Sequence, residues 1–315
     1  MKIHSICLIK NESDIIIQTL RSAISWSDFI YVYDNGSTDG TWEKVINLAK
    51  DYKQIIPYKQ DGQPYSESLR SEPFNYYRTN SSEGDWWCKL DADEIYIDDP
   101  RTFLCKIPKK YDLVWSASFE YYFTDKDLVL YNQNPSLYAD DIPVEEKCRY
   151  YINDWSEFRF FRDKKNLIWE KSLVRTEGAH PSGLSTVYPQ RIRLKHFQYR
   201  SPQQIQKRLH SRTEAMQNGV FLHEKRIDWK GNIGNLDNPG WDENNFSYDR
   251  NYLPQSWEER VVPSSRLLYD SHDEKYIINE KVLPKIPISQ SIYTRFINKI
   301  LAVPNKIKNI YGLRK

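Results

Sequence analysis

The first sixty residues alternate between short β-branched runs and segments whose apolar residues recur at helical spacing. The runs at 3–9, 29–33 and 54–58 are rich in isoleucine, valine and tyrosine, as strands are. Between them, 14–26 and 41–52 each carry apolar residues on one helical face. Strands and helices that alternate in this way form parallel strands joined by right-handed crossovers. The pattern predicts an α/β fold, in which ligands bind beyond the carboxyl ends of the strands.

The junction after the second run is rich in turn-forming residues. It reads DNGSTDGT, and Asp34 and Asn35 follow the strand directly, where side chains can face a ligand. The following residues relax the backbone or offer caps for the next helix, namely Gly36, Gly40, Ser37 and Thr38. A plain turn between a strand and a helix carries the same residue types. The junction alone therefore does not establish a ligand site.

A second junction places acidic residues directly after an apolar run at 86–90 that contains two tryptophans. It reads LDADE, with Asp91, Asp93 and Glu94 at its end. Side chains two apart in an extended segment share a face, so Asp91 and Asp93 are expected to point the same way. Two adjacent carboxylates repel unless a cation lies between them, and hard oxygen ligands suit Mg²⁺ or Mn²⁺. A solvated acidic loop is the commoner fate of such clusters, but here the cluster follows an apolar strand.

Three motifs together resemble a family 2 glycosyltransferase with the GT-A fold. They are LIKNE after the run at 3–9, DNGSTDGT after the run at 29–33 and LDADE at the end of the run at 86–90. The motifs stand in the expected order and spacing within residues 1–100. The resemblance implies a nucleotide-diphospho-sugar transferase fold, a Rossmann-like mixed sheet flanked by helices, with a C-terminal helical extension. It divides the chain into a catalytic core at 1–200, a helical and loop-rich extension at 201–290 and a basic amphipathic tail at 291–315. The core comprises a nucleotide-sugar half to residue 100 and an acceptor half beyond it.

The resemblance also assigns binding residues. In that family the ends of the first two strands hold the nucleobase and ribose, and an arginine before the DxD strand often contacts the nucleotide. The chain offers both Arg70 and Arg78 for this role. The expected nucleotide contacts are Asn11, Glu12, Asp34, Asn35, Arg70 or Arg78, and Asp91. Asp93 is the expected metal ligand to the donor diphosphate.

The second half of the sequence carries a weaker resemblance. Runs at 111–123, 157–161 and 191–197 predict further strands, and a helix is predicted from Pro202, with Ser201 as its cap and Gly219 after its end. The apolar face of this helix comprises Ile205, Leu209 and Met216.

The stretch KHFQYRSPQQIQK, which leads into this helix, resembles a His-aromatic-Arg-Ser element of related transferases. The resemblance implies His196 as a further metal ligand. Arg200, with neighbouring lysines, suits a diphosphate contact. His180 in EGAHPSG is the alternative histidine.

Glycosyl transfer requires the nucleotide diphosphate to leave with additional negative charge, which a divalent ion at Asp93 and His196 would stabilise. If the anomeric centre is inverted, as the resemblance favours, a carboxylate must take the proton of the acceptor hydroxyl. The candidate bases are Asp154, Glu157 and Glu120. The acceptor-side acidic motif usual in the family is absent, so the sequence neither chooses among them nor establishes inversion.

Composition limits partners and location. The formal net charge is +2 with charges interspersed, so no general affinity for nucleic acid is expected. The four cysteines lack metal-like spacing and no run approaches the length of a membrane span, so a cytoplasmic chain is expected. The tail at 291–315 has six basic residues and no acidic ones, a pattern that suits peripheral binding to the anionic inner face of a membrane. A helix docked on the protein's own core, or a frayed tail, fits the same pattern equally well.

The sequence therefore predicts a metal-dependent transferase that moves a sugar from a nucleotide-diphosphate donor, UDP-linked by family expectation, to a saccharide or lipid-linked saccharide in surface polysaccharide or glycan synthesis. Mn²⁺ or Mg²⁺ is the expected cofactor. A non-catalytic carbohydrate-binding or scaffold protein on the same fold is the first alternative, against which the intact Asp91 and Asp93 pair argues. A sugar nucleotidyltransferase is the second, but LIKNESD lacks a glycine-rich phosphate loop.

Overall fold

The computed structural model describes residues 1–172, 178–217, 233, 256–271 and 275–286. In this part of the chain a ten-stranded mixed sheet has the order β10-β7-β6-β8-β4-β1-β2-β3, with β9 beside β6 and β5 beside β9. The strands are β1 (Ile3–Ile9), β2 (Phe29–Asp34), β3 (Ile55–Gln60), β4 (Trp86–Asp91), β5 (Glu94–Tyr96), β6 (Leu113–Tyr122), β7 (Tyr150–Trp155), β8 (Phe158–Arg162), β9 (Ile192–His196) and β10 (Leu268–Tyr269). The helices are α1 (Ile16–Ile24), α2 (Thr41–Asp51), α3 (Ser71–Tyr77), α4 (Pro100–Cys105), α5 (Asp125–Gln133), α6 (Val144–Lys147) and α7 (Pro202–Gln217).

The four strands β3, β2, β1 and β4 lie side by side and run parallel, as the alternation of strands and helices predicts. Near the end of β1, Leu8 lies opposite Tyr33 of β2 on one side and opposite Asp91 of β4 on the other. The three strands therefore finish at the same edge of the sheet. The residues that follow each of them are brought together there.

The second half of the sheet is mixed. β8 runs antiparallel to β4, β6 runs antiparallel to β8, and β7 runs antiparallel to β6. β9 is parallel to β6 and antiparallel to β5, so it lies between them. The predicted strands at 111–123, 157–161 and 191–197 correspond to β6, β8 and β9. The predicted α/β class, a mixed sheet flanked by helices, is confirmed.

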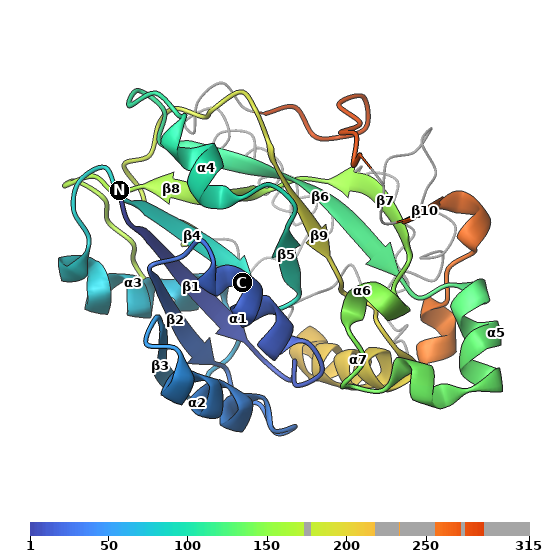
Figure 1. Ribbon diagram of the computed structural model, residues 1–315. Coiled ribbons are helices and arrows are strands. Elements are labelled where there is room, and N and C mark those ends of the chain that lie inside the picture. The colour runs from blue at the N-terminus through green and yellow to red at the C-terminus, as the bar shows by residue number, and fades with distance from the viewer. Residues whose placement is uncertain (173–177, 218–232, 234–255, 272–274, 287–315) are drawn as a thin grey trace, which may run out of the picture.

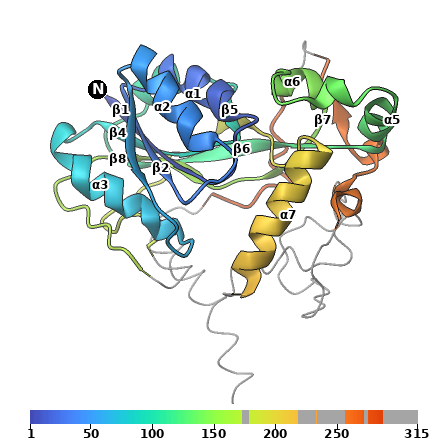
Figure 2. The ribbon, with the colours of Figure 1, turned by 90° about the horizontal axis from the view of Figure 1, so that it is seen from below.

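Helices cover both faces of the sheet. α1 and α2 lie on one face and α3 lies on the other, as the view in Figure 2 shows. α7 lies along the end of the sheet toward which β1, β2 and β9 run (Figure 1). This helix therefore faces the edge at which the sequence predicts the ligand site.

The predicted start and apolar face of α7 are confirmed. Ser201 Oγ accepts a hydrogen bond from the backbone N–H of Gln204 at 3.2 Å, as a helix cap does. Ile205 and Leu209 are fully buried, and Met216 is nearly so. Gly219 lies outside the described residues. Burial of these apolar side chains holds α7 against the end of the sheet.

α2 begins later than its turn residues predict. It starts at Thr41, whereas Ser37 or Thr38 was expected to cap it. The residue before the helix is Gly40, whose φ of 87° lies in the left-handed region that favours glycine. The hydroxyl of Ser37 is engaged by another segment, described below.

No helix within the described ranges is long and apolar enough to cross a membrane. The basic tail at 291–315 lies outside those ranges. Its proposed contact with a membrane surface stays a prediction.

Candidate functional site

The turn residues that follow β2 form hydrogen bonds with the residues that follow β1. Ser37 Oγ accepts a hydrogen bond from the backbone N–H of Asn11 at 2.8 Å, and the N–H of Thr38 donates to Asn11 Oδ1 at 2.9 Å. The N–H of Glu12 donates to Thr41 Oγ1 at 2.9 Å. Asn11 itself has a φ of 57°, a conformation in which asparagine is enriched. These hydrogen bonds between turn residues hold the ends of β1 and β2 together.

Asp34 and Asn35 are almost completely buried at the end of β2. Asp34 Oδ1 accepts the N–H of Ser37 at 2.6 Å, and Asn35 Nδ2 donates to the carbonyl of Gln63 at 2.8 Å. Asp34 Oδ2 and Asn35 Oδ1 have no hydrogen-bond partner among the described residues. Burial raises the pKa of Asp34. Buried acceptors are normally satisfied, so these two oxygens are available to accept hydrogen bonds. A contact of Asp34 or Asn35 with a nucleotide stays a prediction.

The two acids of the DxD motif have different partners. β4 ends at Asp91, and residues 92 and 93 form a turn before β5. The alternation of an extended strand therefore does not extend to Asp93, and the reason for expecting the two side chains to share a face does not apply. A cation shared by Asp91 and Asp93 stays a prediction. Asp91 contacts two arginines, whereas Asp93 contacts His196.

The Asp91 cluster consists of Asp91, Glu94, Glu157, Arg70 and Arg159. Arg159 Nη2 lies 2.9 Å from Asp91 Oδ2 and 2.7 Å from Glu157 Oε1, and it also forms an ion pair with Glu94. Arg70 forms an ion pair with the other oxygen of Asp91. The three carboxylates lie within 4.8 Å of one another, close enough to hold a metal ion. A guanidinium instead contacts all three.

Electrostatics in the Asp91 cluster follow from these contacts. Burial opposes ionisation of Asp91, but the guanidiniums of Arg159 and Arg70 outweigh it and lower the pKa of Asp91. Burial raises the pKa of Glu94 to about 8, and its Oε2 lacks a partner among the described residues. Both arginines are nearly inaccessible to solvent. This cluster is neutralised by the protein's own cations.

The Asp93 cluster consists of Asp93, His196, Glu120, Arg200 and Arg208. Asp93 Oδ1 lies 3.3 Å from His196 Nε2, and its Oδ2 lies 3.8 Å from Arg200 Nη1 and 4.0 Å from Arg208 Nη1. His196 Nδ1 lies 2.8 Å from Glu120 Oε2. The structure thus brings together Asp93 and His196, the two residues predicted to bind metal, from the β4–β5 turn and the end of β9.

The charges of this cluster are strongly coupled. Burial opposes ionisation of Asp93, but His196 and the two arginines outweigh it and hold the pKa of Asp93 well below its usual range. Burial lowers the pKa of His196, but the carboxylates of Glu120 and Asp93 outweigh it and raise that pKa well above the usual value. Asp93 is therefore ionised at neutral pH.

Asp93 and His196 fit a divalent cation. Two metal–ligand bonds of about 2.1 Å at a right angle place their ligand atoms about 3 Å apart. The observed separation between Asp93 Oδ1 and His196 Nε2 is 3.3 Å. A carboxylate oxygen with an imidazole nitrogen suits Mn²⁺, which accepts both donor types. No arginine comes as close to Asp93 in the described part of the chain as Arg159 comes to Asp91.

Arg200 and Glu12, both predicted to contact the nucleotide, contact each other. Arg200 Nη2 donates to Glu12 Oε2 at 2.6 Å, its Nε donates to Asp14 Oδ2 at 2.8 Å, and its Nη1 donates to the carbonyl of Phe197 at 2.7 Å. Burial raises the pKa of Glu12 to about 7. Arg200 thereby ties the end of β9 to the end of β1. A contact of either residue with the nucleotide stays a prediction.

The three candidate bases differ in how their carboxylates are engaged. Glu157 binds Arg159 and accepts the indole N–H of Trp155 at 3.2 Å. Glu120 contacts His196. Asp154 is partly exposed on β7 and forms no ion pair within the described residues. Burial and the nearby charge of Glu120 raise the pKa of Asp154 to about 7, a value suited to a general base.

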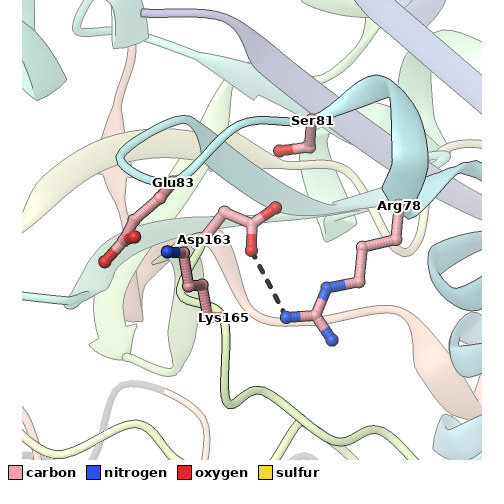
Figure 3. A pocket seen from close by; sticks show the side chains of 5 residues that line it. All are labelled: Arg78, Ser81, Glu83, Asp163 and Lys165. Carbon is pink, nitrogen blue, oxygen red and sulfur yellow. Dashed lines mark ion pairs between the residues drawn. The ribbon is translucent and has the colours of Figure 1, made fainter.

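Arg78 lies near the start of β4, through its contact with Asp163, whereas Asp91 ends that strand. It lines a pocket of about 280 Å³ with Ser81, Glu83, Asp163 and Lys165, beside the first residues of β4 (Figure 3). Its guanidinium reaches toward Asp163, 3.7 Å away, and donates to backbone carbonyls. Of the two arginines that the sequence offered, Arg70 is the one that contacts Asp91.

His180 also lies apart from Asp93. Its ring packs edge-on against Phe158 at 5.2 Å between centroids, and its Nδ1 lies 3.1 Å from the carbonyl oxygen of Pro181. The histidine that contacts Asp93 is His196.

Sequence reasoning missed Arg159, Gln198 and Arg208. Arg159 lies within the apolar run EFRFF. A charged side chain in a buried strand requires a partner, so the sequence does indicate that Arg159 pairs with an acidic residue. Gln198 and Arg208 gave no comparable signal. Their roles depend on how the segment after β9 and the α7 helix return to the site.

No protein-family model and no curated protein matches the chain. Among solved structures, TarS from S. aureus matches 38% of this chain at 15% identity, with a TM-score of 0.29. The mannosyltransferase PcManGT from Pyrobaculum calidifontis, in complex with GDP-Man and Mn²⁺, matches 51% at 15% identity, with a TM-score of 0.30. The matched segments span only 22% and 44% of those chains. At this level of similarity, only the residues of the site itself bear on function.

Proposed function

We propose that this chain is a metal-dependent glycosyltransferase of the GT-A type. It would move a sugar from a nucleotide-diphosphate donor, UDP-linked by family expectation, to a saccharide or lipid-linked saccharide acceptor. The observation that carries the proposal is the pairing of Asp93 and His196, with 3.3 Å between Oδ1 and Nε2. They lie at the sheet edge where β1, β2 and β4 end, the place at which open α/β sheets bind ligands.

The donor would lie across this edge. Asp34 and Asn35 would accept hydrogen bonds from the nucleoside through the two acceptor oxygens described above. Asp93 and His196 would hold a divalent cation that, when bound, supplies positive charge for the departing diphosphate. Arg208 Nη1, 4.0 Å from Asp93 Oδ2, is a cation on the same side of the site. Fixed positive charge placed where negative charge develops lowers the barrier to transfer.

Asp154 would be the base in an inverting reaction. The carboxylates of Glu120 and Glu157 are each held by a cationic or hydrogen-bonding partner. Asp154 is partly exposed, and its raised pKa of about 7 suits acceptance of a proton from an acceptor hydroxyl. The reaction forms the bond from that oxygen to the anomeric carbon and breaks the bond from that carbon to the diphosphate.

The test is release of free nucleotide from a panel of UDP-, GDP- and dTDP-sugars, with added Mn²⁺, Mg²⁺ or EDTA and a mixture of saccharide acceptors. Release that requires the metal and disappears in Asp93→Asn supports the proposal. His180→Ala is the matched control and should release nucleotide at the wild-type rate, since His180 packs against Phe158. Absence of release from every donor, together with saccharide binding, would instead identify a carbohydrate-binding protein.

A further inference from the structure

Glu120 combines deep burial with a contact to the predicted metal ligand His196. The register of the sheet sets this contact, because Glu120 of β6 and His196 of β9 are paired in the parallel ladder. Glu120 Oε2 lies 2.8 Å from His196 Nδ1, and Oε1 lies 3.1 Å from the same nitrogen. The Glu120 side chain is 3% exposed. Such a carboxylate is poorly placed to meet an acceptor hydroxyl.

Gln198 holds the other side of the same carboxylate. Its Nε2 donates to Glu120 Oε2 at 2.6 Å, and its Oε1 accepts a hydrogen bond from Arg208 Nη2 at 3.3 Å. Arg208 in turn lies 4.0 Å from Asp93. The contacts therefore close into a ring that runs Asp93, His196, Glu120, Gln198, Arg208 and back to Asp93. In this ring Glu120 is anchored from two directions.

A neutral imidazole carries one N–H and one free lone pair, and the partner of one nitrogen decides the state of the other. An ionised carboxylate only accepts hydrogen bonds. To bind a cation, His196 would have to lose one of the two protons that its raised pKa indicates, and Glu120 favours the tautomer in which Nδ1 keeps its proton. In that tautomer the lone pair is on Nε2, the nitrogen that lies 3.3 Å from Asp93 Oδ1.

We infer that Glu120 is a positioning residue, which orients His196 and presents Nε2 as a metal ligand, and is not the base. The inference rests on the proposed metal-dependent function. Partners of this kind behind a ligating histidine raise the basicity of the ligand and fix its ring. Glu120 contacts His196 directly and reaches Asp93 otherwise only through Gln198 and Arg208, so we expect its effect on metal binding to depend mainly on that histidine.

The experiment is a titration with Mn²⁺ in the presence of UDP, followed by the electron paramagnetic resonance signal of free Mn²⁺. Glu120→Ala should raise the dissociation constant for Mn²⁺ about 10- to 100-fold. Glu120→Gln keeps an acceptor oxygen and nearly the same volume, so it should bind Mn²⁺ more tightly than Glu120→Ala. It also serves as the test variant if the alanine variant does not fold.

The matched control is Glu145→Gln. Glu145 forms an ion pair with Lys195, the neighbour of His196, at 2.6 Å and is 44% exposed. The Glu145→Gln substitution removes an equal charge close to β9, and the dissociation constant for Mn²⁺ should stay at the wild-type value. If Glu120→Ala likewise keeps the wild-type value, the inference is wrong.

A double variant tests the route of the effect. In a His196→Ala background, Glu120→Ala should weaken Mn²⁺ binding no further, because residues that act through one another are not additive. A further loss equal to that in the wild-type background would overturn the inference. Loss of turnover in Glu120→Gln with unchanged Mn²⁺ binding would overturn it too and identify Glu120 as the base.

The same titration separates the inference from its premise. If the wild-type chain binds no Mn²⁺ with UDP present, the metal-dependent function itself is wrong. If the wild type binds Mn²⁺ and Glu120→Ala binds it equally well, the metal site stands and only the positioning role is lost.

Discussion

Asp91 and Asp93 are two residues apart in one motif, but the clusters around them differ in which cations contact the carboxylates. In the first, Arg159 contacts three carboxylates and Arg70 contacts the other oxygen of Asp91. In the second, among the residues that the structure describes, the nearest arginine nitrogen lies 3.8 Å from Asp93, and the closest ionic partner is the imidazole of His196. The first is neutralised by the protein's own cations, whereas the second is suited to receive a cation from solution.

The two acids of the DxD pair have different partners in the protein. Removing a charge from water is costly unless a partner compensates it, so each buried carboxylate must have a cation. For Asp91 the compensation is permanent, because both arginines are buried with it. For Asp93 the compensation comes from His196, at 3.3 Å, and from two arginines that lie farther away. We expect substitutions in the Asp93 cluster to affect chemistry and those in the Asp91 cluster to affect stability.

The largest expected effect is on turnover in Asp93→Asn. The variant removes the charge that balances the metal and leaves a poorer ligand of similar volume. Metal catalysis supplies several kcal/mol, so the rate of nucleotide release should fall on the order of 10³-fold. Because His196 and two arginines hold the pKa of Asp93 well below its usual range, its charge also stabilises the fold, so circular dichroism should show a lower melting temperature than the wild type, but a smaller loss than in Arg159→Met. A variant that unfolds while its surviving molecules keep full activity would break the comparison.

The second prediction concerns Arg159→Met in the Asp91 cluster. It leaves buried Glu94 without its ion-pair partner. Removing one member of a buried ion pair costs about 3 to 5 kcal/mol in the free energy of unfolding. Chemical denaturation at pH 8 should show this loss.

Arg193→Met is the control for that loss. Arg193 pairs with Asp98 at 2.6 Å but is 32% exposed, so its removal should cost less than about 1 kcal/mol. If the two arginine variants lose stability equally, Arg159 is not the cation that neutralises the cluster.

The third prediction uses ligand-linked stability to separate the clusters. UDP with Mn²⁺, at ~100 times the dissociation constant, should add about 2.7 kcal/mol to the free energy of unfolding. UDP or Mn²⁺ alone should add less. Glu157→Gln, in the Asp91 cluster, should keep the gain, and Asp93→Asn should lose its metal-dependent part. Equal gains in both variants would mean that the ion does not bind Asp93.

The smallest expected effect is the pH dependence of turnover. The pKa of Asp154 is raised to about 7, so below pH 7 its carboxyl is protonated and cannot accept a proton. The value of kcat/KM should therefore rise about tenfold from pH 6 to a plateau above pH 7. In Asp154→Asn this rise should be absent. A rise that persists in the variant would point to another base.

The same shift has a consequence for stability. Because the folded pKa of Asp154 exceeds its ordinary value of 3.8, the folded state binds the proton more tightly than the unfolded state does. Its contribution to stability is therefore lost as the pH rises from about 4 to 7. Asp154→Asn should unfold at a higher temperature than the wild type at pH 8 and show a smaller advantage at pH 5.

Much of the nucleotide-binding half was predictable because its signals are local. Runs of β-branched residues and helical spacing predicted β1, β2 and β3, and the parallel order of these strands followed from their alternation with helices. Asp34 and Asn35 were predicted at a strand end because chain order alone places them there. The start of α2 was predicted too early, because Ser37 binds Asn11 across the junction and is not available as a cap.

By itself, the sequence determined the α/β class, the parallel half of the sheet and the set of acids and histidines from which a site is built. Only the tertiary structure decided which of them meet. The turn at residues 92–93 interrupts the strand between Asp91 and Asp93, and the pairing of β9 with β5 and β6 brings His196 between Asp93 and Glu120. His196 is 76 positions from Glu120 and 103 positions from Asp93 in the sequence. Such contacts depend on strand register and helix packing, which local propensities do not encode.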